Sequence, residues 1–78
     1  ELALREVEAY RAIGHDYGEA RALRSIGIDA RSIGDFTRAT TAFEESLALH
    51  RRANRRSSMV LLLADLSSNS GALGDFGR

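Results

Sequence analysis

The chain has 78 residues, of which 44% are hydrophobic, and its eleven acidic and eleven basic side chains leave no formal net charge. This length holds at most one small domain, and the ordinary hydrophobic content argues against disorder. Balanced charge provides no overall field to attract nucleic acid or an anionic membrane. The absence of cysteine excludes disulfides, a thiolate nucleophile and cysteine-bound zinc.

The apolar runs are too short for a membrane-spanning helix or a signal peptide. The longest, residues 59–64, falls far below the roughly 18 residues that a span requires. We therefore expect a soluble cytoplasmic protein. Because the sequence begins at Glu1, without methionine and inside a helical pattern, we also expect it to be part of a longer chain.

The first two predicted helices are separated by Gly14. Residues 1–13 and 17–33 both carry apolar residues at spacings of three and four, which is typical of amphipathic helices. Gly14 suits a left-handed stop, and Asp16 with Glu19 matches a capping box for the second helix. The predicted buried positions are Ala3, Val7, Tyr10 and Ile13, followed by Ala20, Leu23, Ile26, Gly27, Ala30 and Ile33.

Two further helices are expected after Gly34. Asp35 is the predicted cap of a helix that runs from Phe36 to about residue 52. Asn54, which tolerates a left-handed backbone, is its predicted terminator, and Ser57 or Ser58 is expected to cap a fourth helix. The predicted buried positions are Phe36, Ala39, Phe43, Ser46, Leu47 and His50, then Leu63, Leu66, Ser70 and Leu73. The predicted fold class is all-α.

The sequence matches itself after a shift of 40 positions. Gly34–Phe36 falls on Gly74–Phe76, and Leu23 falls on Leu63. Helix stops also coincide, since Gly14 falls on Asn54. Agreement across turns, caps and apolar stripes indicates an internal repeat of two helices per unit. The second Gly-Asp-Phe would then open a fifth helix at Phe76.

Residues 20–53 resemble a tetratricopeptide repeat, a helix-turn-helix unit of 34 residues. Leu23, Ile26, Gly27 and Ala30 match the first helix, Gly34, Asp35 and Phe36 the turn, and Ala39, Phe43, Ser46 and Arg51 the second helix. The resemblance implies antiparallel helix hairpins of an α-solenoid, with about two units. Residues 1–13 would be the second helix of a preceding repeat, 17–53 a complete repeat, and 57–78 the first helix and turn of a following one.

The spacing of 40 exceeds 34, and Ser67 stands where the pattern has glycine. In this respect the chain resembles the long-period repeats of bacterial LuxR-type regulators and signalling ATPases. Gly27 and Ala39 are small where two helices must approach, and Phe36 and Phe43 are the expected aromatic anchors. Because about three repeats are usually needed to bury every apolar face, we expect neighbouring repeats or self-association through exposed end faces.

The candidate partner-binding residues lie on the first helix of the complete repeat. Arg21, Arg24, Ile28 and Arg31 are spaced by three, four and three, so they share one face. The tetratricopeptide resemblance places that face in the concave groove, where arginines would grip acidic side chains or a terminal carboxylate of a protein or peptide. The corresponding positions of the next unit are Leu61, Ala64, Ser68 and Gly71.

Both candidate surfaces have a plainer interpretation. The arginines would form a solvated face paired with acidic side chains, for instance Arg24 with Asp29. The run from Met59 to Leu63 would be core together with an interface to a neighbouring repeat. In that case the chain is a structural or assembly segment of a regulator.

No catalytic or cofactor motif is present. The sequence lacks a phosphate-binding glycine loop, a serine elbow and convergent metal ligands, so we expect no enzyme activity, cofactor or metal. His15 is expected to be exposed in a turn, and His50 to pack inside the fold. Residues 50–56, HRRANRR, form a basic cluster that a small DNA-binding helical domain would place on phosphates. The balanced charge disfavours this third alternative.

Overall fold

The computed structural model describes the backbone of residues 2–72 and the side chains of residues 4–69. Within that part the chain forms four α-helices and no strand: α1 (Leu2–Ala12), α2 (Asp16–Ser32), α3 (Phe36–Arg52) and α4 (Arg56–Ala72). The expected all-α class is confirmed. Leu73, the second Gly74–Phe76 turn and a fifth helix lie outside the described residues.

The connections between these helices share one hydrogen-bonding pattern. The residues Gly14, Gly34 and Asn54 have φ angles of 71°, 85° and 57°. The amide of each donates to the carbonyl three residues earlier, and the next amide donates to the carbonyl five residues earlier, as in His15 N to Tyr10 O at 2.9 Å and Arg55 N to His50 O at 3.0 Å. This is the Schellman arrangement of a helix end. The left-handed stops predicted from sequence are therefore confirmed.

The next helix begins two residues after each left-handed residue. One of the three predicted caps is confirmed and two are wrong. Asp35 caps α3 by accepting a hydrogen bond from the Arg38 amide at 3.2 Å. At α2 the cap is His15, whose Nδ1 accepts from the Gly18 amide at 3.0 Å, so the prediction of Asp16 was wrong. Helix α4 begins at Arg56, and Ser57 and Ser58 lie inside it instead of capping it.

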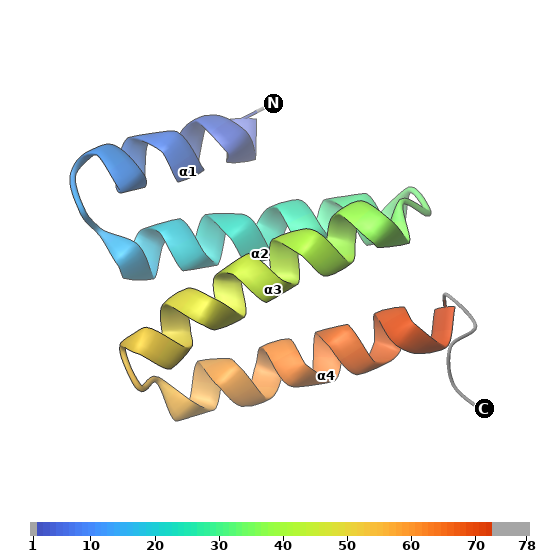
Figure 1. The fold of residues 1–78 in the computed structure, drawn as a ribbon. Coiled ribbons are helices and arrows are strands. Elements are labelled where there is room, and N and C mark those ends of the chain that lie inside the picture. Colours follow the sequence, from blue (N-terminus) through green and yellow to red (C-terminus); the bar gives the residue numbers. More distant parts are fainter. Residues whose placement is uncertain (1, 73–78) are drawn as a thin grey trace.

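Successive helices run in alternating directions and lie side by side in a staggered row (Figure 1). The row measures 42 × 28 × 13 Å, so it is little more than one helix thick. Each helix packs mainly against the helix before it and the helix after it in the chain. Helix α3 lies between α2 and α4, and on one broad side of the row the side chains of α2 and α4 reach each other across it. Within residues 2–72 no helix combines the length and apolar character needed to cross a bilayer.

The first core cluster joins α1, α2 and α3. Its members are Val7, Ala20, Ala22, Leu23, Ile26, Ala42 and Leu49, with Tyr10 packed at its edge. Tyr10 reaches the cluster because α2 has glycine opposite it: a methyl group built on Gly18 would lie 2.5 Å from the Tyr10 ring. The α2–α3 contact also contains a buried polar link, in which Ser46 Oγ donates to the Ala20 carbonyl at 2.7 Å.

The second core cluster is built around Phe43 and joins α2, α3 and α4. Phe43 is fully buried with Ala30, Ala39, Leu47 and Leu62, and Met59 and Leu66 pack against them. The ring lies against the backbone of α2 at Gly27, where an added methyl group would be 2.5 Å from Phe43 Cε1. The predicted close approach at Gly27 is confirmed, and Ala39 is fully buried in the same cluster. Phe36, the other expected anchor, is only half-buried.

Three predicted core residues are instead exposed to solvent. Ile13 and Ile33 are 73% and 77% exposed, because each follows the last residue of a helix and its side chain no longer continues the helical stripe. Leu63 is 52% exposed. Helix α4 turns the neighbouring Leu62 toward α3, and adjacent residues on a helix point about 100° apart. The burial of Ala3, Ser70 and Leu73 lies outside the described side chains.

We expect Gly27→Ala to lower the free energy of unfolding by about 1–3 kcal/mol, because its methyl group overlaps the Phe43 ring. Chemical denaturation would measure the loss. The double variant G27A/F43L should recover part of it, since leucine is smaller than phenylalanine. Ser25→Ala, at an exposed position of the same helix, is the control and should change little. A G27A chain as stable as the parent would contradict the close contact.

Candidate binding surface

Helix α2 carries the predicted arginine face, and its four members have different environments. Arg21 and Ile28 are exposed, whereas Arg24 and Arg31 are half-buried. The half-buried pair points toward α4, whose side chains reach α2 across α3 on one broad side of the molecule. The four residues predicted to share one face therefore form two groups: Arg24 and Arg31 contact α4, and Arg21 and Ile28 are exposed.

A carboxylate on α4 holds two of the arginines. The Nε atom of Arg24 lies 2.8 Å from Asp65 Oδ2, and Arg31 Nη1 lies 3.7 Å from Asp65 Oδ1. The Asp65 side chain is only 11% exposed, so this bridge is partly shielded from water. The acidic partner of Arg24 is thus 41 residues away in sequence, and not Asp29, which is exposed on α2.

Aromatic rings contact the guanidinium groups as well. Arg31 lies over the ring of the buried Phe43, with 5.7 Å between its Cζ atom and the ring centroid. Arg21 lies 5.9 Å from the centroid of Tyr17, one turn earlier on α2. None of the ion pairs formed among the described residues involves Arg21. Arg21 is therefore the arginine of this face whose charge is not already paired within the fold.

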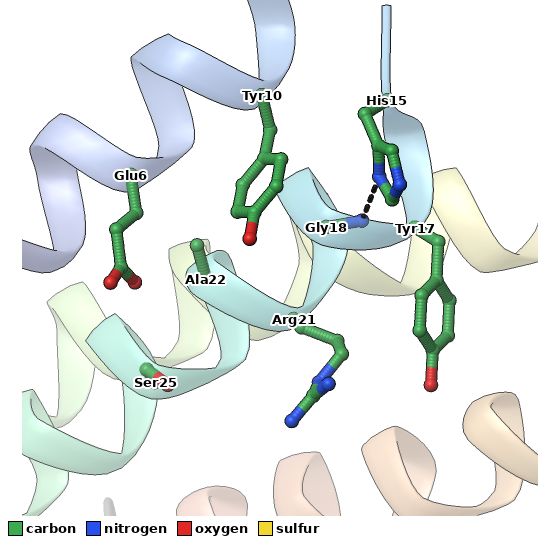
Figure 2. A pocket seen from close by; sticks show the side chains of 8 residues that line it. All are labelled: Glu6, Tyr10, His15, Tyr17, Gly18, Arg21, Ala22 and Ser25. Carbon is green, nitrogen blue, oxygen red and sulfur yellow. Dashed lines mark hydrogen bonds between the residues drawn. The ribbon is translucent and has the colours of Figure 1, made fainter.

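Arg21 also lies where three surface hollows meet. The first, of about 320 Å³, lies between α1 and α2 and is lined by Glu6, Tyr10, His15, Tyr17, Gly18, Arg21, Ala22 and Ser25. Figure 2 shows the Tyr17 and Arg21 side chains extending away from α1, in the direction of the pale orange ribbon of α4. Its lining offers a carboxylate, a guanidinium and two phenol groups, which suits a polar ligand.

The second hollow, of about 110 Å³, leads from Arg21 to α4 and is lined by Tyr17, Arg21, Arg24, His50, Ser58, Leu61 and Leu62. A third, of about 120 Å³, runs along α2 past Arg21, Arg24, Ser25 and Ile28. We refer to Tyr17, Arg21, Arg24, Ile28 and Leu61 as the Arg21 surface. Leu61 of the predicted set thus joins the arginines, while Ala64 and Ser68 are exposed elsewhere on α4.

Sequence reasoning missed a cluster at the edge of this surface. Arg55 donates from Nη2 to Asp16 Oδ1 at 3.1 Å, and its Nη1 lies 3.2 Å from His50 Nδ1. The same guanidinium lies 4.9 Å from the Tyr17 ring centroid. Asp16 and Arg55 are 39 positions apart and no local motif links them. The sequence signal for this cluster is weak. Asp16 and Arg55 stand at the starts of α2 and α4, and the repeat brings these two helix starts to one end of the molecule.

Burial and charge shift two pKa values in the cluster. Burial lowers the pKa of His50 below its ordinary value of 6.5, and the positive charge of Arg55 lowers it further. The hydrogen bond from Arg55 lowers the pKa of Asp16 below 3.8. Because Arg55 can only donate, His50 Nδ1 acts as the acceptor and the ring is neutral.

The remaining predicted features contain no convergent site. His15 is exposed, as expected, but its Nδ1 is engaged in capping α2. Of the basic residues in 50–56, Arg55 is bound inside the fold, while Arg51, Arg52 and Arg56 are exposed. In the part of the chain that the structure describes, no three histidine or carboxylate groups lie close enough to hold a metal ion.

Comparisons with protein families, with curated proteins and with solved structures find no match for this chain.

We expect Asp65→Asn to lower the free energy of unfolding by about 1–3 kcal/mol, because it removes the charged acceptor of Arg24 in a shielded position. Denaturation of D65N, R24Q and the double variant would give the coupling energy. The coupling of D65N to R31Q should be smaller, since that pair is 3.7 Å apart. Asp29→Asn makes the same change at an exposed position; equal losses in D65N and D29N would contradict the bridge.

We expect the free energy of unfolding to fall as pH drops from 7.5 toward 5. His50 has a folded-state pKa below 6.5, so in the window just below 6.5 the unfolded chain binds more protons than the folded chain. Denaturation at a series of pH values would show the slope. His50→Gln keeps an acceptor for Arg55 and should flatten it. An equally steep slope in H50Q would show that His50 is not responsible.

Proposed function

We propose that this chain is a protein-interaction module of the tetratricopeptide type, which binds an acidic peptide segment of a partner protein on the Arg21 surface. Three features support the proposal: the self-similarity at 40 residues, the side-by-side row of helices with equal connections, and the exposed unpaired arginine on the side formed by α2 and α4. The family resemblance further suggests that such a module belongs to a cytoplasmic signalling protein.

The observation that carries the proposal is the unequal use of the three arginines. Asp65 accepts from Arg24 and approaches Arg31, so one carboxylate serves two guanidinium groups. Arg21 has no ion-pair partner among the described residues, and the three arginines together retain positive charge. Arg21 can present its guanidinium to a carboxylate in the bidentate manner that gives arginine its selectivity for this group. Its position over Tyr17 restricts the side chain, which reduces the entropy lost on binding.

Apolar contacts flank the charge on both helices. Ile28 lies along α2, and Leu61 lies across the hollow on α4 with 53% of its surface exposed. A ligand that places a carboxylate at Arg21 would therefore bring apolar side chains against Ile28 or Leu61. This combination favours a peptide with alternating acidic and apolar residues over a small anion, because apolar contact area adds to the charge interaction.

A labelled peptide of alternating glutamate and leucine tests the proposal by fluorescence anisotropy. We expect Arg21→Glu to weaken binding by about tenfold or more, since a hydrogen bond to a charged group contributes roughly 1.5–3 kcal/mol. Arg52→Glu makes the same charge change in a separate hollow, lined by residues of α1, α2 and α3, and should bind as the parent does.

Circular dichroism should show the same helicity for both variants. A glutamine–leucine peptide should bind weakly to the parent chain. If the peptide binds R21E and R52E equally, or binds neither variant nor parent, the Arg21 surface is not the acidic-peptide site.

A further inference from the structure

Helix α4 is apolar on two opposite faces, and only one of them is covered. Leu62 and Asn69 are fully buried against α3. On the opposite side lie Val60, Leu63, Ala64 and Ser67, at helical spacings of three, one and three, and all are exposed. Val60 is 64% exposed and Leu63 52%. We call these four residues the α4 outer face.

The equivalent face of α2 is covered by another helix. The bounds of α4 are those of α2 shifted by 40 residues, and the same hydrogen-bonded turn precedes each helix. Under that shift three of the four residues, Val60, Leu63 and Ser67, correspond to Ala20, Leu23 and Gly27, and α3 packs on these three through Ser46, Leu49 and Phe43. The fourth, Ala64, corresponds to the half-buried Arg24. The α4 outer face is therefore a helix-packing surface, and a helix apolar on all sides is ordinarily buried.

The absence of charge on the α4 outer face favours an uncharged partner surface. Between Ser57 and Ala72 the only charged residue is Asp65, and it is bound to Arg24 on the inner side. The α4 outer face thus carries no charge. Helix α1 is related to α3 by the same shift, but it would place Glu6 at the position of the buried Ser46. Burying an unpaired carboxylate is costly, so pairing of α4 with α1 of another copy is disfavoured.

We propose that two copies of this chain associate through their α4 outer faces, as an antiparallel pair of α4 helices around a two-fold axis near Ala64. A two-fold pair needs only one self-complementary surface. Alanine at the centre lets the helices approach closely, with Val60 and Leu63 of each copy packed on the other. The pairing is separate from the proposed peptide binding at Arg21.

The ends of the paired helices also match. Arg56 is exposed four residues before Val60, on the same stripe. In an antiparallel pair centred on Ala64 it lies beside Ala72 of the other copy's α4, at the end of that helix that carries partial negative charge. Helix α4 has no basic residue in its own last turn. The arginine of each copy thus supplies the positive charge that the other copy's helix end lacks.

Sedimentation equilibrium of the 78-residue chain tests the pairing. We expect a monomer–dimer equilibrium whose dissociation constant rises at least tenfold in Leu63→Arg. Ile33→Arg places the same charge at an even more exposed isoleucine outside α4 and should leave the constant unchanged. Circular dichroism would establish that both variants fold. A chain that stays monomeric at millimolar concentration overturns the proposal, as does equal dissociation of the two variants.

Cysteine cross-linking tests the geometry, because the parent chain contains no cysteine. Ala64→Cys should form a disulfide-linked dimer under mild oxidation, since the two copies of a residue near a two-fold axis lie close together. Ala48→Cys, exposed on α3, is the matched control and should form far less. Assemblies larger than a dimer, or equal cross-linking of the two variants, would indicate stacking through other faces and would overturn the two-fold pair.

Discussion

The contact between the Phe43 ring and the backbone of α2 at Gly27 fixes the rest of the structure. No side chain separates the two helices at that level, so the ring fills the space and reaches Leu62 on α4. One aromatic side chain thereby touches three helices, and its burial stabilises the fold by about 1.5–3 kcal/mol. In a row one helix thick, with little core to spare, the spacing of α2, α3 and α4 depends on this contact.

The same spacing determines the chemistry of the exposed side. Because α3 holds α2 and α4 close together, Asp65 can reach Arg24 and Arg31 across the gap, and Arg31 covers the Phe43 ring. Two of the three arginines, Arg24 and Arg31, therefore stabilise the fold. Arg21 lies one turn nearer the start of α2, beyond the reach of Asp65, and remains available for a ligand. The proposed function rests on this difference between arginines that pair with Asp65 and an arginine that does not.

Helix ends and the packing of small and aromatic residues were predictable from the sequence, and polar contacts between helices were not. Gly14, Gly34 and Asn54 ended helices as expected, because the left-handed conformation is a local requirement that few residues meet. Gly27 and Phe43 were placed correctly because small and aromatic residues have narrow roles in helix packing. His15 was missed as a cap, since histidine seldom serves as one. Asp65 and Arg55 were missed because their partners, 41 and 39 positions away, depend on how α4 is rotated and on which end of the row each side chain occupies. That rotation also exposed Leu63, which the repeat pattern had placed in the core.

Nuclear magnetic resonance of the arginine Nε–H groups measures the central claim directly, with each signal assigned by an arginine-to-glutamine variant. The Arg24 signal should show slow hydrogen exchange, because its Nε donates to the shielded Asp65. The Arg21 signal should exchange rapidly in the free chain. Addition of the glutamate–leucine peptide should shift and protect Arg21 and leave Arg24 bound to Asp65. If Arg24 exchanges as fast as Arg21, or if the peptide perturbs Arg24 and Arg31 before Arg21, the proposed division of the arginine face is wrong.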